Sequence, residues 1–127
     1  MSKLLARAKV KLFNAKNDYR NVSLDDAYID DCCYNLQQCI EFGLKFIVEM
    51  NGENYVENHD VRAQINKLKT IGVTLPFENE IRILASTLNS WEAESRYKDD
   101  FTALGEDIED AMKLAEKIVD YCEGLIS

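Results

Sequence analysis

The sequence predicts an all-α protein, an up-and-down bundle of four to five helices in a single domain over residues 1–127. Three observations support this fold class. Apolar residues recur at intervals of three and four, which is the spacing of one helical face. The chain contains one proline and five glycines, so few residues interrupt a helix. A pattern typical of a strand is confined to the short run 71–75.

The first two expected helices occupy the first part of the chain. Apolar residues recur on one face over residues 3–19 and again over about 25–50. Ser23 is the candidate N-cap of the second helix, because its hydroxyl can accept a hydrogen bond from a free backbone N–H. Gly43 can let a neighbouring helix approach this helix closely. Asn51-Gly52 supplies residue types that end a helix.

Three further helices are expected at about 59–71, 78–94 and 105–125, each with apolar residues on one face. Asn58 is the expected N-cap of the first of them. The segment from Ser95 to Leu104 is mostly polar and is expected to connect the last two helices. These assignments account for nearly the whole chain as helix.

The net charge is −8, which argues against a broad basic surface for binding nucleic acid without sequence preference. No run approaches the ~20 apolar residues of a membrane span. Charged residues also interrupt the N-terminal segment too early for a signal peptide. We therefore expect a cytosolic protein without membrane contact. Basic residues concentrate near the start of the chain, as a local patch or a solvated face: Lys3, Arg7, Lys9, Lys11 and Lys16.

The cysteines do not form a disulfide framework. Three of the four, Cys32, Cys33 and Cys39, lie within eight residues of one expected helix, and the fourth is Cys122. Reduced thiols in the core are the expectation, because free cysteine is among the most buried residue types.

The single histidine, His59, follows a helix cap and precedes Asp60, so an imidazole and a carboxylate can share a site here. Local packing of His59 is the alternative. One histidine without a Cys-x-x-Cys or Glu-x-x-His pair supplies no zinc or di-iron ligand set, so no metal site is expected. A nucleophilic triad would depend wholly on His59, and no glycine-rich phosphate loop indicates a nucleotide cofactor.

Two other groups of polar residues are candidates for a functional role. Glu41 and Lys45 have the favourable acid-before-base spacing on the second helix, with Gln38 one turn earlier. An exposed stabilising pair is one interpretation, and orientation of a polar loop such as the one carrying His59 is the other. Arg96 and Tyr97 combine a cation with an aromatic ring, which can hold a phosphate and stack on a base. Docking of the adjoining connection explains them as well.

These motifs together resemble the HEPN domain family over about residues 3–126. The run Gln38 to Lys45 is similar to the family's Gln-x-x-Glu-x-x-Leu-Lys stretch. Asn58-His59-Asp60-Val61 is similar to its Thr-His-Asp-Leu helix start, and Ser95-Arg96-Tyr97 resembles its Arg-Tyr element. The closing helix also resembles that of the family. The resemblance implies a four- to five-helix bundle, often a homodimer, that frequently partners a minimal nucleotidyltransferase in toxin–antitoxin or defence modules.

Many members of the family cut RNA, and those that do resemble one another in an arginine, four to six intervening residues, and a histidine. That pattern is absent downstream of Arg96, where Phe101, Thr102 and Ala103 occupy the corresponding positions. A missing histidine is a missing candidate base. The nuclease activity is therefore not carried over from the resemblance.

Three functional hypotheses follow. The first is a non-catalytic HEPN-like subunit that binds a nucleotidyltransferase and contacts a nucleotide or RNA; its candidate residues are Lys45, His59, Asp60, Arg96 and Tyr97. The second is a divergent ribonuclease toxin with a composite site of His59 and Arg96. The third is a structural helical scaffold.

Overall fold

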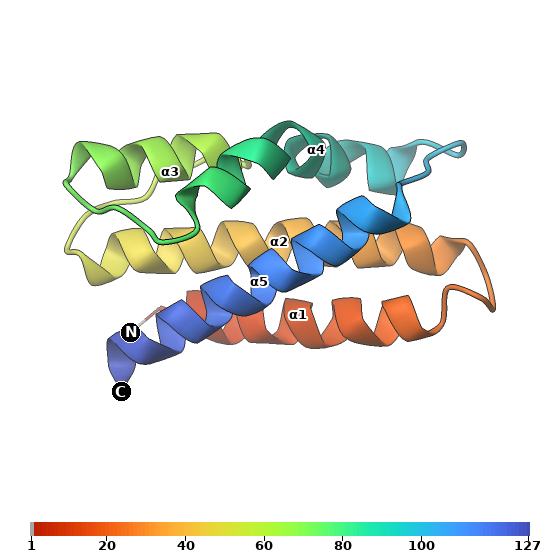
Figure 1. The fold of residues 1–127 in the computed structure, drawn as a ribbon, viewed down its shortest axis with the longest axis horizontal. Coiled ribbons are helices and arrows are strands. Elements are labelled where there is room, and N and C mark those ends of the chain that lie inside the picture. Colours follow the sequence, from red (N-terminus) through yellow and green to blue (C-terminus); the bar gives the residue numbers. More distant parts are fainter. Residues whose placement is uncertain (1) are drawn as a thin grey trace.

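The computed structural model describes residues 2–127 and contains five α-helices in that range, which confirms the all-α prediction. Figure 1 shows α1 and α2 as an antiparallel pair, α3 and α4 along one side of them, and α5 crossing obliquely. The helices are α1 (Leu4–Arg20), α2 (Ala27–Met50), α3 (Val61–Thr70), α4 (Glu78–Tyr97) and α5 (Gly105–Ile126). None of the helices in the described range is both long enough and apolar enough to cross a membrane.

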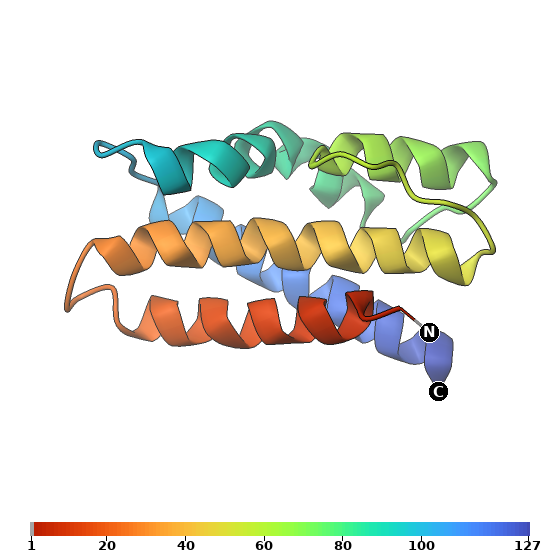
Figure 2. The ribbon, with the colours of Figure 1, turned by 180° about the vertical axis from the view of Figure 1, so that it is seen from behind.

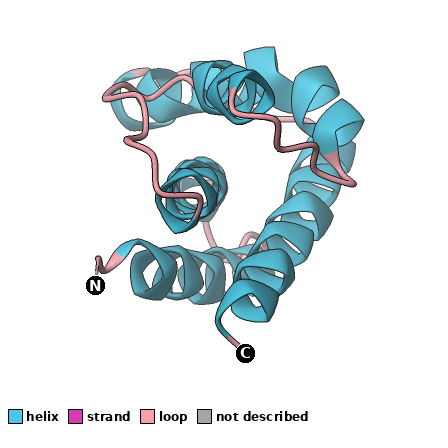
Figure 3. Ribbon diagram, turned by 90° about the vertical axis from the view of Figure 1, so that its left-hand side faces the viewer, coloured by secondary structure: helices cyan, strands magenta, loops and turns pink. Residues whose placement is uncertain are grey.

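The long helix α2 lies at the centre of the molecule. It contacts each of the other four helices, and the end-on view in Figure 3 shows them around it. Leu36, Ile40, Leu44 and Ile47 are fully buried along it, at the three- and four-residue spacing of one helical face. The apolar periodicity of α2 therefore organises the core.

Glycine permits the closest helix contact. A Cβ built at Gly43 would overlap Cγ2 of Ile118 on α5, and the thiol of Cys122 lies 3.4 Å from the Gly43 carbonyl oxygen, to which it can donate. The expected close approach at Gly43 is confirmed. All four cysteines are buried, and burial raises the pKa of the Cys39 and Cys122 thiols to about 12.

The expected cap of the second helix is wrong. α2 begins at Ala27, after turns at residues 21–24 and 26. The Asp25 carboxylate accepts a hydrogen bond from the Ala27 N–H at 2.9 Å, so Asp25 and not Ser23 supplies a side-chain acceptor here. Asp25 can do so because the donor lies two positions after the acceptor, which is the spacing of an Asx turn.

The expected end of the fourth helix is also wrong, because Ser95, Arg96 and Tyr97 belong to α4 rather than to the connection. Trp91 and Ser95 are buried one helical turn apart, and the Ser95 hydroxyl donates to the Trp91 carbonyl at 2.5 Å. The segment was expected to be a connection because it is mostly polar, although its buried residues continue the spacing of a helix.

Candidate functional site

One side of α2 carries polar side chains that are nevertheless buried. Gln37, Gln38, Glu41 and Lys45 are exposed by 0, 6, 1 and 7%, respectively. Figures 2 and 3 show that no helix of the described chain covers one side of α2. The loop between α2 and α3, which carries His59, packs against this polar stretch. The expected Glu41–Lys45 pair is present, but it is not the exposed pair that its spacing suggested.

These side chains form a continuous hydrogen-bonded chain. The Gln38 amide donates to Gln37 at 2.7 Å, and the Gln37 amide donates to Glu41 Oε1 at 2.9 Å. Lys45 Nζ donates to the other oxygen, Glu41 Oε2, at 2.9 Å, and it also lies 4.9 Å from the ring centre of Tyr55. Buried charges are tolerated when they are paired and fully hydrogen-bonded. Both carboxylate oxygens of Glu41 are therefore held by side chains of α2.

The His59 ring lies against the Glu41 carboxylate. Its Nδ1 is 3.1 Å from Glu41 Oε1, and 62% of its side chain is exposed while Glu41 is almost fully covered. The Gln37 amide also reaches the backbone carbonyl of His59 at 3.5 Å. A buried carboxylate against one ring nitrogen fixes the orientation of the imidazole. His59 therefore presents an oriented and accessible ring.

Asp60 holds the loop in place rather than facing His59. Its carboxylate accepts from the Arg62 N–H at 2.9 Å as the N-cap of α3, which replaces the expected cap, Asn58. It also accepts from the Asn89 amide of α4 at 2.7 Å, and Asn89 Oδ1 accepts from the Val61 N–H at 3.1 Å. Asp60 thus ties the loop and the start of α3 to α4.

Arg96 and His59 converge on a single carboxylate, that of Glu92. Arg96 Nη2 lies 2.6 Å from Glu92 Oε1, and His59 Nε2 lies 3.9 Å from the same oxygen. The two nitrogens can therefore be no farther apart than the sum of these distances. The helix brings Glu92 and Arg96 together because they are one turn apart, and Asp60 fixes His59 next to them.

Two tyrosine rings flank the guanidinium. Arg96 Cζ lies 4.9 Å from the ring centres of both Tyr34 and Tyr97, a distance at which a cation is attracted to an aromatic face. Tyr97 is 74% exposed. Lys11 of α1 lies 5.3 Å from the centre of the Tyr34 ring as well. Cations and aromatic faces thus alternate from α4 across α2 to α1.

Sequence reasoning placed His59 near the polar stripe of α2 but missed Glu92 and Tyr34. Glu92 has the same acid-before-base spacing to Arg96 that Glu41 has to Lys45. That signal is meaningful only if the helix continues through Arg96, and the expected helix ended before it. Tyr34 lies one turn before Gln38 on the same side of α2, a position that the spacing alone could have indicated.

The described residues contain no group of three His, Cys, Asp or Glu side chains arranged to hold a metal ion. The sequence pattern of the HEPN domain matches residues 1–125, nearly the whole chain. No curated protein and no solved structure matches the chain. The expected resemblance of the chain to this family is confirmed by the match.

Proposed function

The chain belongs to the HEPN domain family, and from this premise we propose that it is a single-domain binding subunit that contacts a nucleotide or RNA through Arg96, Tyr97 and His59. The observation that carries the proposal is the flanked guanidinium, with Arg96 Cζ 4.9 Å from each of two tyrosine rings. Arginine pairs with phosphate through a planar fork of donors, and an exposed aromatic face stacks on a base.

Its immediate surroundings support this role. Tyr97 has most of its ring exposed, and the Arg96 side chain is about one third exposed while it pairs with Glu92. A guanidinium has five N–H donors, so an incoming phosphate can bind the donors of Arg96 that Glu92 does not use. Lys45 contributes indirectly, because its ammonium neutralises Glu41 beneath His59. Asp60 contributes by anchoring the loop that carries His59.

The partners belong to the proposal as well. We propose a cytosolic subunit that forms a homodimer, binds a minimal nucleotidyltransferase and acts within a toxin–antitoxin or defence module. The family resemblance supports these assignments. Co-purification with a nucleotidyltransferase encoded next to this chain tests the partner, and recovery of this chain alone from cells that express both would count against it.

Titration of a fluorescently labelled single-stranded RNA with the full chain tests the contact itself. Anisotropy should rise saturably, and Tyr97→Ala should weaken binding about tenfold, since one stacked base is worth ~1–3 kcal/mol. The same titration with labelled ATP separates a nucleotide site from an RNA site. If neither probe binds the wild type, the binding role is lost and the structural scaffold remains.

A divergent ribonuclease is the second candidate function, and one observation favours it. His59 is accessible, is oriented by the buried Glu41, and shares the carboxylate of Glu92 with Arg96. A general base must be oriented against the proton that it removes, and Arg96 would stabilise charge on the phosphate. In this reaction His59 accepts the proton of a ribose 2′-hydroxyl while that oxygen attacks the adjacent phosphorus. The bond between phosphorus and the 5′-oxygen of the next nucleotide breaks, and this oxygen takes a proton from water, so the products are a 2′,3′-cyclic phosphate and a 5′-hydroxyl end.

An RNA-degradation assay separates the two candidates. Binding alone predicts the same background degradation by the wild type and by His59→Ala. Degradation by the wild type that His59→Ala abolishes would establish the ribonuclease instead. Circular dichroism of both proteins shows whether the variant has kept its helices.

A further inference from the structure

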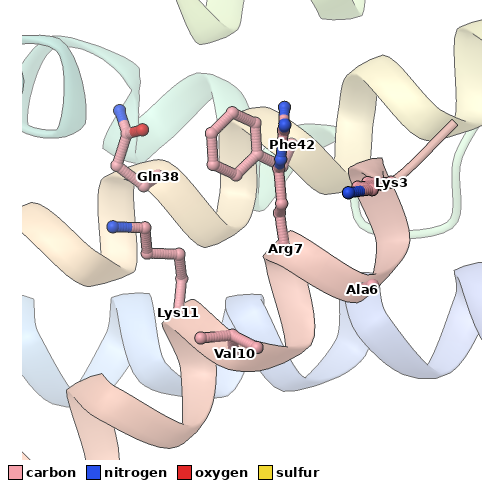
Figure 4. A pocket seen from close by; sticks show the side chains of 7 residues that line it. All are labelled: Lys3, Ala6, Arg7, Val10, Lys11, Gln38 and Phe42. Atoms are coloured by element: carbon pink, nitrogen blue, oxygen red, sulfur yellow. The ribbon is translucent and has the colours of Figure 1, made fainter.

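The outer face of the α1–α2 hairpin carries a groove that the proposed nucleotide or RNA contact does not use. Its cavity of about 430 Å³ opens between the two helices and falls within the ~300–1,000 Å³ that is typical of small-molecule sites. Figure 4 shows Arg7 and Lys11 extending from α1 towards α2 across this groove. The groove is therefore large enough for a small organic ligand.

The walls of the groove are apolar although they are open to solvent. They are formed by Ala6 and Val10 of α1 and by Phe42 of α2. Val10 is 57% exposed, and Phe42 is only partly buried. Exposed apolar surface gains free energy when a ligand covers it. These walls therefore favour a ligand with an apolar body.

The rim of the groove is cationic. Lys3, Arg7 and Lys11 follow one another at intervals of four residues, so their charges lie one helical turn apart and repel one another. Within residues 2–127, the ion pairs of α1 are made instead by Lys9 and Lys16, with acidic residues of α5. An anion in the groove would relieve the repulsion along the rim.

The groove also lacks the acidic side chains that are common elsewhere on this protein. Among its described lining residues none is acidic, although the chain contains 23 aspartates and glutamates. The polar residue on its α2 side is Gln38, a neutral amide that donates to Gln37 at 2.7 Å. The groove is thus a local site for negative charge on an otherwise acidic protein.

The shape of the groove selects among anions. Figure 2 shows α1 and α2 side by side over most of their length, so the groove between them is elongated. From Lys3 to Lys11 it extends for ~12 Å, at ~1.5 Å per helical residue. An inorganic phosphate would leave the apolar walls in water, and an uncharged hydrocarbon would leave the cations unpaired. A long and narrow molecule with one anionic end satisfies both.

We propose that this groove binds a free fatty acid of medium length, an unbranched aliphatic carboxylate. The carboxylate pairs with Arg7 and Lys11, and the chain runs past Phe42 towards Lys3, whose aliphatic stem covers it. The site goes beyond the proposed nucleotide or RNA contact and does not rest on it. Apolar burial supplies the affinity, and the two cations fix which end of the ligand lies at Lys11.

Isothermal titration calorimetry of the full chain with sodium hexanoate, octanoate and decanoate, each below its micelle concentration, tests the site. One molecule should bind per chain. Each added methylene should tighten binding about two- to fourfold, since burying one fully is worth about fourfold. Octan-1-ol, which has the chain of octanoate without its charge, should bind at least fivefold more weakly than octanoate.

Two substitutions with matched controls locate the site. Arg7→Gln should weaken decanoate binding about fivefold, as the loss of a partly exposed charge-assisted contact. Lys9→Gln removes the same charge from the side of α1 that meets α5 and should stay within about twofold of wild type. Val10→Asp brings a competing carboxylate to Arg7 and Lys11 and should weaken binding at least tenfold. Ile83→Asp, at a position 80% exposed on α4, should have little effect.

Several outcomes would overturn the proposal. These are no binding of decanoate by the wild type, an affinity that does not depend on chain length, and equal losses in Arg7→Gln and Lys9→Gln. Co-sedimentation with vesicles of dioleoyl phosphatidylglycerol, without binding of free decanoate, would assign the groove to a lipid surface instead. Circular dichroism should show the same helix content in every variant and in the wild type with decanoate; loss of helix on adding decanoate would mean that it acts as a detergent.

Discussion

The two sides of α2 are buried in different ways, one by apolar packing and the other by hydrogen bonding between polar and charged side chains. Towards α5, Gly43 lets Ile118 approach the backbone, and Cys39 and Cys122 are fully buried. On another side, Glu41 and Lys45 are almost as well buried but are charged. The first side is stabilised by close packing and the second by complete hydrogen bonding. Fold and candidate function therefore occupy separate sides of one central element.

The polar side is stable only while every member keeps its partner. Among the described residues, no buried side-chain nitrogen or oxygen lacks a hydrogen-bond partner. A satisfied network of this kind fixes one arrangement of its side chains, whereas a network with one missing partner carries the desolvation penalty of the group left behind. Substitutions on the polar side should therefore behave unlike those on the packed side.

Glu41→Leu should have the largest effect on stability. It leaves the Lys45 ammonium buried without its counter-charge, which costs about 3–5 kcal/mol in the free energy of unfolding. Urea unfolding measures it. The pair Glu94–Lys98 has the same spacing on the surface, and Glu94→Leu should leave stability unchanged. Replacing Glu41 and Lys45 together by methionine should restore most of the loss; an additive loss in that double variant would contradict the account.

Gly43→Ala should have the next largest effect on stability. It should lower the free energy of unfolding by about 1–3 kcal/mol, because the new methyl group overlaps Ile118. In an open helical position the same change normally stabilises by up to ~1 kcal/mol. Gly124 on α5 is such a position, because a Cβ added there would meet no heavy atom within 4 Å. Gly124→Ala should therefore be neutral or slightly stabilising. Equal effects of the two substitutions on the urea midpoint would show that the packed side is not tight.

The smallest expected signal is the labelling of the cysteines of the packed side in the native protein near neutral pH. Burial raises the pKa of Cys39 and Cys122 to about 12 from an ordinary 9.0. The thiols are therefore protonated and covered at pH 8, and a thiol-reactive dye should label them only as fast as the protein unfolds. Because these pKa values are raised on folding, their contribution to stability is complete below about pH 9 and is lost towards pH 12. Immediate labelling of the native protein would contradict this.

Helical periodicity was sufficient to predict the fold, because each helix has an apolar face and neither strands nor prolines compete. It was also sufficient to suggest that the stripe of Gln38, Glu41 and Lys45 meets the loop of His59. It could not show that the Glu41–Lys45 pair is buried, because spacing on one helix does not reveal which other elements cover that helix. Glu92 was missed for a related reason: its spacing to Arg96 has meaning only if α4 continues, and the end of a helix is its least predictable part.

Binding of labelled single-stranded RNA by Arg96→Ala and Arg82→Ala tests the central claim most directly. Both arginines lie on α4, pair with a glutamate one turn earlier and have about one third of their side chain exposed. Of the two, Arg96 alone lies beside tyrosine rings and His59. Arg96→Ala should weaken binding about tenfold, the value of a charge-assisted hydrogen bond to phosphate, and Arg82→Ala should leave it within about twofold of wild type. Equal losses in the two variants would mean that RNA is held by general charge, and the site around Arg96 would be refuted.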